Sequence, residues 1–294
     1  MIFTLGEAVY DIIFKHNEPV ASVHGGSMYN VAVSLGRAGK KVAFTGFYAD
    51  DRIGNQSVEF LKQNGVNVDS FLPVEGVKSN LALAFLNAEL IPQYEFYRDE
   101  QLNGHAYKVD ISSAKYLITG SFYAIDDRNF KHVYNLVEIA KQNNVPIIYD
   151  PNIRGKHLNQ KQQRYERIAK LMERADLVKL STEDLYHITG KNSLNEWMIY
   201  LDSNNVEHFI LTDGASPVRA RFRGEELVVE VPQVDVVSSV GGGDGFTAGF
   251  AARGPGAMEN LTEFRKAIEQ GIAFAGQVCT SNENYISKDL QTEI

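Results

Sequence analysis

The sequence predicts an α/β fold with a mostly parallel central sheet covered by helices on both faces. One observation is a recurring order, in which a short apolar run typical of a buried strand precedes a helical pattern. Another is that, over 294 residues, no Pro/Gly/Ser-rich or charged stretch longer than a turn marks a domain boundary. Repeated strand and helix pairs are typical of the βαβ units that build parallel sheets. The paired segments are 41–46 with 54–63, 115–120 with 127–143, 145–150 with 161–173, and 176–180 with 182–190.

Two stretches, at 8–23 and 79–98, interrupt this order. They contain the strand-prone segments YDIIF, LALAFL and YEFYR, with no helical pattern between the last two. We expect an antiparallel ribbon that buries its apolar side chains against the active-site cleft or against another subunit. The alternative is an extension at the edge of the main sheet. The chain is therefore predicted to be one domain, 1–294, with lid segments at about 8–24 and 76–100.

The composition excludes several classes of protein. Lys and Arg number 29 against 37 Asp and Glu, a formal charge of −8, so the positive field that would hold a nucleic acid is missing. The single cysteine, Cys279, cannot form an internal disulfide, and the usual spacings of zinc ligands are absent. No basic segment precedes an apolar run at the N-terminus, and no run of about 18 apolar residues occurs. We expect a cytoplasmic protein without nucleic-acid or membrane partners.

The segment 237–250, VSSVGGGDGFTAGF, carries the strongest chemical signal. Three glycines, Gly241, Gly242 and Gly243, run into Asp244 at the start of a small-residue helix. Backbone without side chains lets several N–H groups converge on an anion at a helix start, where the helix dipole also favours negative charge. A carboxylate there would repel a phosphate, so its presence favours a base that takes a proton during reaction. The alternative is a flexible turn with Asp244 as a helix cap.

A second glycine segment, HGGSMYNVAVSLGRAG at 24–39, places Gly25 and Gly26 before a helix. Ser27 is the expected helix cap, and Asn30 lies on the first turn. Backbone N–H groups and the Asn30 amide are suited to bind the hydroxyls of a small polar ligand. The alternative is a tight turn followed by an ordinary amphipathic helix.

Seven segments follow one another along the chain: LGEAVYD (5–11), GGSMYNVAVSLGRAG (25–39), GFYADDRIG (46–54), YDPNIR (149–154), KLSTED (179–184), LTDGA (211–215) and GGGDGFTAGF (241–250). In this order they resemble the pfkB family of carbohydrate kinases, over nearly the whole chain, and the motifs at the two ends are the specific ones. The resemblance implies a ribokinase-like fold with a small β-sheet lid. YDPNIR and YEFYR are most similar to the fructokinase and 2-keto-3-deoxygluconate kinase branch.

The resemblance implies a role for each matching residue. Asp244 resembles the base that deprotonates a sugar hydroxyl as it attacks the γ-phosphate of ATP, and the N–H groups of Gly241 to Gly243 resemble the anion hole. Arg98 and Arg154 match arginines near the sugar or the phosphates, with a solvated surface position as the alternative for each. The positions that match sugar-binding residues are Asp11, Gly25, Gly26, Asn30, Arg98 and Arg154.

On the nucleotide side, the resemblance implies binding of ATP and Mg²⁺. Thr212 and Gly214 resemble a nucleotide-phosphate turn, and Ser181 to Asp184 stands where the family has the NxxE pattern. The shorter Asp184 carboxylate is expected to contact Mg²⁺ through water, because that ion keeps several of its waters. Ser238 replaces the usual Asp of DTxGAGD, and a hydroxyl attracts a cation less than a carboxylate does. Activation by potassium is therefore not expected.

Several functions stay open at this point. The leading one is ATP-dependent phosphorylation of a sugar hydroxyl, with fructose as the expected sugar, and 2-keto-3-deoxygluconate or another sugar as the alternative. A sugar-binding regulator that has lost turnover is the candidate from another class, motivated by Ser238 and Asp184. A dinucleotide-binding oxidoreductase is disfavoured because GxGxxG does not follow the first strand. Exposed ribbon edges in the lid favour a homodimer formed through it.

Overall fold

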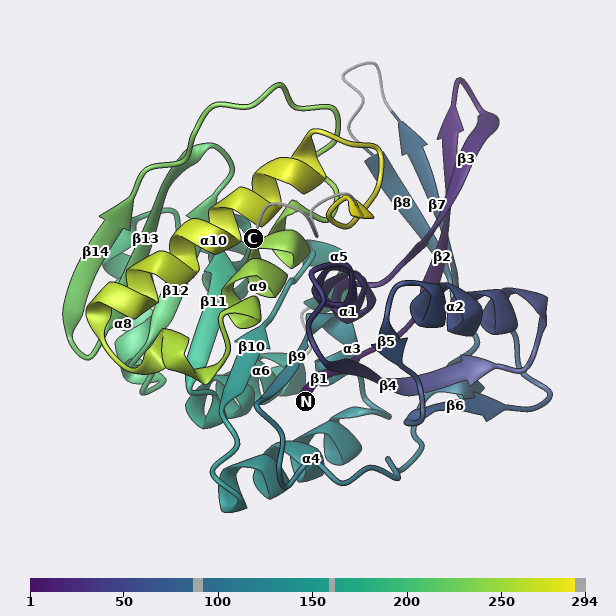
Figure 1. The fold of residues 1–294 in the computed structure, drawn as a ribbon, viewed down its shortest axis with the longest axis horizontal. Coiled ribbons are helices and arrows are strands. Elements are labelled where there is room, and N and C mark those ends of the chain that lie inside the picture. Colours follow the sequence, from purple (N-terminus) through teal and green to yellow (C-terminus); the bar gives the residue numbers. More distant parts are fainter. Residues whose placement is uncertain (87–91, 159–161, 289–294) are drawn as a thin grey trace.

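The computed structural model describes residues 1–86, 92–158 and 162–288, and these form two β-sheets (Figure 1). The large sheet has the strand order β14-β13-β12-β11-β10-β9-β1-β4-β5, with β6 also paired to β4. Strands β4 and β9 are buried almost throughout, as expected for strands covered on both faces. The strands are β1 Ile2–Leu5, β4 Val42–Ala49, β5 Val66–Asn67, β6 Phe71–Val74, β9 Tyr116–Gly120, β10 Ile147–Asp150, β11 Leu177–Ser181, β12 Phe209–Asp213, β13 Ser216–Phe222 and β14 Glu225–Val229.

The middle of the large sheet is parallel. β1 pairs in parallel with β4 and β9, and the parallel pairing continues through β10 and β11 to β12. The predicted α/β fold with a mostly parallel sheet is confirmed. β13 and β14 add an antiparallel edge, which lies beyond the strand and helix pairs from which the sheet is predicted. The carboxyl ends of the parallel strands meet at one edge, where ligands of such sheets bind.

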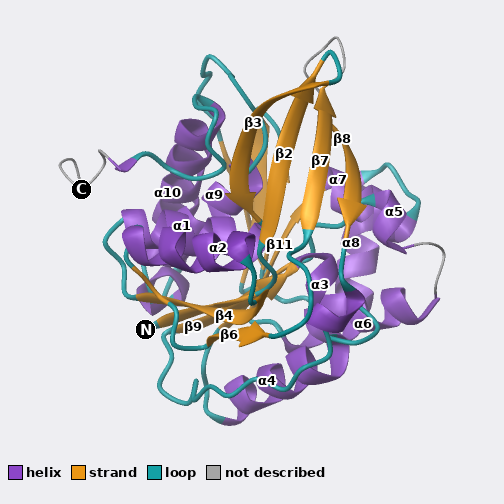
Figure 2. Ribbon diagram, turned by 90° about the vertical axis from the view of Figure 1, so that its right-hand side faces the viewer, coloured by secondary structure: helices purple, strands orange, loops and turns teal. Residues whose placement is uncertain are grey.

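Helices cover both faces of the large sheet (Figures 1 and 2). Adjacent residues of β9 show this division, because Ile118 packs into a core shared with α1, α2, α9 and α10, and Leu117 into one shared with α4, α6 and α7. None of the helices in the described ranges combines the length and the apolar character needed to cross a membrane. The helices are α1 Ser27–Arg37, α2 Arg52–Gln63, α3 Ser121–Ile125, α4 Phe130–Gln142, α5 Gly155–Leu158, α6 Gln162–Arg174, α7 Thr182–Thr189, α8 Leu194–Ser203, α9 Gly242–Ala252 and α10 Leu261–Cys279, with short 3₁₀ helices at Glu100–Leu102 and Pro255–Met258.

The second sheet, called the small sheet below, has the strand order β3-β2-β7-β8 and stands up from the large one (Figure 2). Its separation from the main sheet is confirmed, but the expectation of a purely antiparallel ribbon is wrong. β2 pairs with β3, and β7 with β8, antiparallel, whereas β2 and β7 are parallel. Parallel neighbours need a long crossover, and here the chain passes through the large sheet between them. The strands are β2 Val9–Lys15, β3 Glu18–Gly25, β7 Leu81–Leu86 and β8 Pro92–Tyr97.

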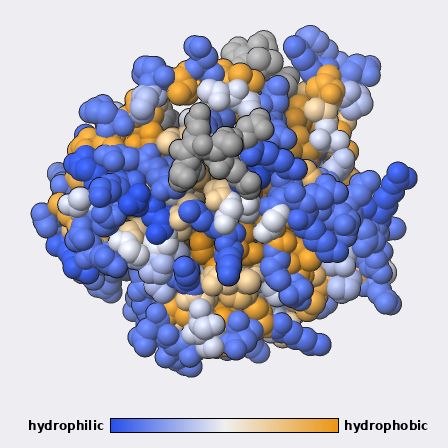
Figure 3. Space-filling model, viewed as in Figure 1, coloured by the Kyte–Doolittle hydropathy of each residue, from blue (hydrophilic) through white to orange (hydrophobic). Residues whose placement is uncertain are grey.

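Alternating side chains give the small sheet two different faces. Asp11 pairs with Ala82, and Ala84 with Tyr94, so these residues share one face. Larger apolar side chains, including Ile12, occupy the other. The molecular surface seen from the side of Figure 1 is mostly hydrophilic, and hydrophobic side chains are visible at the lower centre and, among other places, over the upper right, where the small sheet lies (Figure 3).

Candidate active site

The glycine segment forms the start of α9. Gly241 precedes the helix with φ of 80°, a left-handed conformation that disfavours any side chain. The first N–H groups of a helix have no acceptor within it. Among the described residues, the amides of Gly243 and Asp244 have no hydrogen-bond acceptor, and that of Gly242 donates to the Ser239 carbonyl at 3.3 Å. This helix start therefore presents N–H groups that an anion can bind.

Asp244 is 6% exposed and points toward the start of α1. Its carboxylate accepts hydrogen bonds from Ser27 Oγ at 2.6 Å and from Asn30 Nδ2 at 2.8 Å, and Asn152 Nδ2 lies 3.4 Å away. The carboxylate therefore does not cap its own helix. Burial raises the pKa of Asp244 to about 6, although the hydrogen bonds from Ser27 and Asn30 oppose the shift. A carboxylate with such a pKa is ionised at neutral pH and can accept a proton.

The start of α1 differs from the sequence prediction. Its N-cap is Gly26, with φ of 112° and no capping side chain, rather than Ser27. The Ser27 hydroxyl donates to Asp244 instead and accepts a hydrogen bond from Asn152 Nδ2 at 2.9 Å. An ionised carboxylate accepts a stronger hydrogen bond than a neutral group does, so the Ser27 hydroxyl finds a better acceptor in Asp244 of α9 than in its own helix.

Asp11 supplies a second carboxylate, on the small sheet. A Cβ built on Gly25 would lie 2.6 Å from Asp11 Oδ2, so only glycine leaves room for this carboxylate. Asn284 Nδ2 donates to the same oxygen at 3.4 Å. Burial raises the pKa of Asp11 to about 7, with repulsion from Asp244 and Glu7 adding to the shift. The two carboxylates thus share one electrostatic environment.

Asn30 carries an acceptor that no described residue uses. The side chain is 5% exposed, and its Nδ2 donates to Asp244. Its Oδ1 is buried and has no hydrogen-bond partner among the residues that the structure describes. A buried carbonyl oxygen without a partner is costly, and a ligand hydroxyl would satisfy it.

The two candidate arginines have different surroundings. Arg98, directly after β8, forms an ion pair with Glu7 at 2.9 Å, and its guanidinium lies 4.9 Å from the ring centres of Phe96 and Phe122. With its side chain only 21% exposed, Arg98 is not the solvated surface residue of the alternative interpretation. Arg154 is half-exposed and lies 3.6 Å from Glu183.

Tyr94 lies on the face of the small sheet that carries Asp11. Burial raises the pKa of Tyr94 to about 12; Asp11 and Asp244 add to the shift, and Arg154 opposes it. The charges of both carboxylates and of the Arg154 guanidinium therefore act on the phenol of Tyr94. Asp11, Asp244, Arg154 and this aromatic side chain of β8 therefore belong to one electrostatic neighbourhood.

The candidate nucleotide residues lie along neighbouring strands. Ser181 and Thr212 are register partners at the carboxyl ends of β11 and β12. Gly214 lies in the turn after β12 with φ of 53°. Ser238, in the segment before α9, donates its N–H to the Cys279 carbonyl at 3.2 Å, and its hydroxyl accepts from the Val240 N–H at 3.2 Å.

Asp184 has a role in the local fold. It forms a capping box with Ser181, whose N–H and Oγ both donate to Asp184 Oδ2 at 2.7 Å. Its Oδ1 accepts from the Ile153 N–H at 2.6 Å. In the part of the chain that the structure describes, no three His, Cys, Asp or Glu side chains gather closely enough to hold a metal ion. These residues alone therefore do not form a metal cage.

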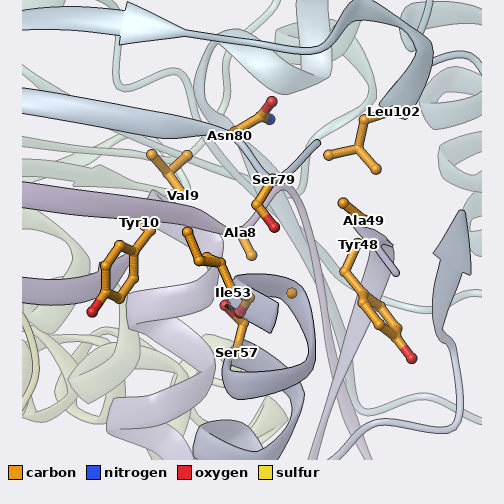
Figure 4. A pocket seen from close by; sticks show the side chains of 11 residues that line it. Ala8, Val9, Tyr10, Tyr48, Ala49, Ile53, Ser57, Ser79, Asn80 and Leu102 are labelled. Atoms are coloured by element: carbon orange, nitrogen blue, oxygen red, sulfur yellow. Dashed lines mark hydrogen bonds between the residues drawn. The ribbon is translucent and has the colours of Figure 1, made fainter. Parts of the chain in front are cut away.

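A small cavity lies at the base of the small sheet (Figure 4). Its volume is about 10 Å³, far below that of a sugar, and Asp244 does not line it. Tyr10, Ile53, Ser79 and Asn80 contribute to its wall. This cavity is therefore not the candidate substrate site, which is the region between the Asp11 and Asp244 carboxylates.

The sequence does not predict four residues near the two carboxylates. They are Tyr94, Asn152, Asn284, and Ser27 in its role as a hydrogen-bond donor to Asp244. Asn152 lies two residues after β10, and its positive φ of 42° marks an unusual backbone conformation. Its position directly after a predicted strand could have identified it, because ligands bind at the carboxyl ends of such strands. No local signal marks Asn284, which lies far along the chain from Asp11.

Comparisons with known proteins bear on the whole chain. A family model described as pfkB family carbohydrate kinase matches residues 1–289. Probable fructokinase-5 from Arabidopsis thaliana is 27% identical, over 97% of this chain and 93% of the relative. Fructokinase-1 from Oryza sativa subsp. japonica is 28% identical, over 92% and 86% of the two chains.

Solved structures share the fold. Fructokinase with bound ATP from Xylella fastidiosa gives a TM-score of 0.85 at 22% identity, covering 96% of this chain and 93% of that one. Aminoimidazole riboside kinase from Salmonella enterica, complexed with aminoimidazole riboside and an ATP analog, gives 0.82 at 20% identity, covering 99% and 97%. Because the family model spans nearly the whole chain, this protein belongs to the pfkB family of carbohydrate kinases.

Proposed function

We propose that this carbohydrate kinase phosphorylates a hydroxyl of fructose with ATP, using Asp244 as the base and the N–H groups of Gly241 to Gly243 as the anion hole. The observation that carries the proposal is the buried Asp244 carboxylate, aimed at the start of α1 beside the N–H groups of Gly243 and Asp244, which have no acceptor among the described residues. Phosphoryl transfer asks chiefly for positioning and for stabilisation of charge, and this arrangement supplies both.

The reaction balances with these groups. The hydroxyl oxygen of the sugar forms a bond to the γ-phosphorus as the bond between that phosphorus and the oxygen of ADP breaks. The hydroxyl proton passes to Asp244, which is ionised at neutral pH because its pKa is about 6. The N–H groups of the first turn of α9 stabilise the negative charge on the transferred group. A positioned base contributes roughly 10²- to 10⁴-fold in rate.

The sugar is proposed to lie between the two sheets. Asp11 would accept hydrogen bonds from neighbouring hydroxyls, and Asn30 Oδ1, which has no partner in the described part of the chain, would accept another. The backbone of Gly25 and Gly26 lines the same place. Arg98 is proposed to act from the base of the small sheet, where it already pairs with Glu7, and Arg154 from the opening of the cleft.

The nucleotide is proposed to bind along the ends of β11 and β12, through Ser181, Thr212 and Gly214. Mg²⁺, which would neutralise charge on the phosphates, is expected to arrive with ATP. We propose that Asp184 contacts Mg²⁺ only through water, because its carboxylate already accepts hydrogen bonds from Ser181 and Ile153. Ser238 offers no carboxylate for a monovalent cation, so we expect no activation by potassium.

Fructose is favoured because several relatives of this chain are named fructokinases. The alternative is 2-keto-3-deoxygluconate or another sugar. An ADP-release assay over fructose, 2-keto-3-deoxygluconate, ribose and nucleosides, at saturating Mg-ATP, tests both. Highest kcat/KM with fructose is expected. A higher value with another sugar rejects the fructose assignment, and no turnover with any of them rejects the kinase proposal.

A second candidate is a sugar-binding regulator without turnover, favoured by the departures at Ser238 and Asp184 from the family pattern. Titration calorimetry with fructose separates the two. Sugar binding without ADP release supports the regulator, whereas turnover that Asp244→Asn abolishes supports the enzyme.

We also propose a homodimer formed through the small sheet. The face opposite to Asp11 carries Ile12, Phe14, Leu83 and Phe85, and the rings of Phe14 and Phe85 stack at 4.8 Å. An apolar sheet face of this kind is typical of subunit contacts. Sedimentation velocity should give a dimer that Leu83→Glu converts to a folded monomer; a wild-type monomer rejects the proposal.

A further inference from the structure

A buried ammonium group lies against the first turn of α9. Lys179, in β11, is 5% exposed, and its Nζ donates to Asp150 Oδ2 at 3.1 Å. A Cβ built on Gly243 would come to 3.0 Å from Nζ, so the charge sits next to the backbone of the candidate anion hole. An ammonium group has three donors, and among the described residues Lys179 uses one.

Asp150 and Thr247 hold this ammonium in place. Asp150 is fully buried at the end of β10, and its Oδ2 also accepts from Thr247 Oγ1 at 2.9 Å. Thr247 Oγ1 lies 3.1 Å from the carbonyl of Gly243 as well. The network therefore connects β10 and β11 to the first turn of α9, and it fixes where the positive charge is.

The surroundings of Lys179 are strongly negative. Burial opposes its charge, but Asp150, Asp184 and Asp244 outweigh burial and raise the pKa of Lys179 above its ordinary value, so the group stays charged at neutral pH. Buried ion pairs are weak stabilisers compared with apolar residues of similar size. Stability alone therefore does not account for this charge, whose position beside Gly243 points to a role at the start of α9.

We propose that Lys179 is a positioning residue of phosphoryl transfer, whose charge stabilises the negative charge that gathers at the N–H groups of Gly241 to Gly243. It acts through the field across the first turn of α9, where a low dielectric strengthens charge interactions. The inference rests on the proposed kinase function and adds a residue to that site.

The decisive variant is the double substitution Lys179→Met with Asp150→Asn. Lys179→Met alone would leave a buried carboxylate unpaired and could unfold the protein, whereas the double variant removes both charges together. The amide that replaces the Asp150 carboxylate can still accept the Thr247 hydrogen bond. Lys141→Met is the matched control, because Lys141 also pairs with an aspartate, Asp176 at 2.8 Å, but on the surface.

The readouts separate charge from structure. In a double variant that unfolds at a temperature near that of the wild type, we expect kcat to fall roughly tenfold or more, with KM for the sugar almost unchanged. Calorimetry should show ADP binding within about threefold of wild type, but ADP with aluminium fluoride, which mimics the transferred phosphoryl group, bound roughly tenfold or more weakly. The deficit in kcat should persist well above the pKa of Asp244, where the base is ionised in both proteins.

Equal weakening of ADP and of ADP with aluminium fluoride in the folded double variant, or unchanged kcat, overturns the role of Lys179. Failure of the proposed function has a different signature. A wild-type protein that phosphorylates no sugar and binds ADP with aluminium fluoride no more tightly than ADP rejects the kinase proposal itself. If the wild type phosphorylates a sugar and binds ADP with aluminium fluoride more tightly than ADP, and the double variant does both equally well, only the inference about Lys179 is rejected.

Discussion

The two sides of the cleft hold their carboxylates differently. Asp244, in the first turn of α9, accepts hydrogen bonds of 2.6 and 2.8 Å from Ser27 and Asn30. Asp11, on the small sheet, accepts one of 3.4 Å from Asn284. Helix α1 therefore fixes the Asp244 carboxylate of α9 before any substrate arrives, while the small sheet leaves Asp11 able to accept hydrogen bonds from a ligand. This difference suggests that chemistry depends on the first side and sugar affinity on the second.

The largest effect is expected from Asp244→Asn. Loss of the base should lower kcat by roughly 10²- to 10⁴-fold while fructose binding, measured by calorimetry, stays within a few fold. Asn retains the size of the side chain, so the loss would report chemistry rather than packing. Fructose affinity that falls in parallel with kcat would contradict the division between the two sides.

A smaller effect, on KM for fructose more than on kcat, is expected from Asp11→Asn. Hydrogen bonds to charged groups contribute about 1.5–3 kcal/mol, so at pH 8, above the Asp11 pKa of about 7, KM for fructose should rise roughly 10- to 100-fold with a smaller change in kcat. Steady-state kinetics at saturating Mg-ATP measures both. Asp110→Asn, on the exposed surface, is the control and should change neither. A variant that lowers kcat without raising KM would place Asp11 with the chemistry instead.

Ser27→Ala should lower kcat by about tenfold and leave KM unchanged. The loss is limited because Asn30 still donates a hydrogen bond to Asp244. Loss of a donor to the carboxylate raises the pKa of Asp244 further above its ordinary value, so the deficit should be larger at pH 6 than at pH 8. Ser34→Ala is the matched control, since Ser34 is buried in the same helix but bonds to the Ile286 N–H. A deficit independent of pH would show that Ser27 does not act through Asp244.

The smallest effect concerns stability. The raised pKa of about 6 for Asp244 means that folding favours its protonated form, so this contribution to stability is present at low pH and is lost as pH rises through about 6. Asp244→Asn should therefore gain about 1 kcal/mol relative to wild type between pH 5 and pH 8, visible as a difference of a few degrees in Tm. A stability difference between the two proteins that does not change with pH would mean that burial does not raise the pKa of Asp244, because its carboxylate would then be ionised in both the folded and the unfolded state over this range.

Much of the fold follows from local sequence patterns. Apolar runs followed by helical periods predict β4 with α2 and β9 with α4, because burial on both faces imposes those patterns. The parallel pairing of β2 with β7 does not follow, since it depends on how two hairpins meet in space. Local periodicity predicts that a segment forms a strand, but it does not predict which other strand pairs with it.

The candidate site shows the same limit. Gly241 to Asp244 and Gly25 to Asn30 stand out as short motifs because their chemistry is local. The bond from Ser27 to Asp244 joins positions 217 apart, and the bond from Asn284 to Asp11 joins positions 273 apart. Such partners are set by the packing of α1, α9 and the segment after α10, which a single sequence does not display.

A crystal structure with fructose, ADP and aluminium fluoride tests the central claim most directly. The account predicts a sugar hydroxyl oxygen about 2.6–3.2 Å from an oxygen of Asp244, with the fluoride ligands facing the N–H groups of Gly241 to Gly243. Asp244 bonded only to Ser27 and Asn30, with the sugar hydroxyl and the fluoride bound elsewhere, would contradict it.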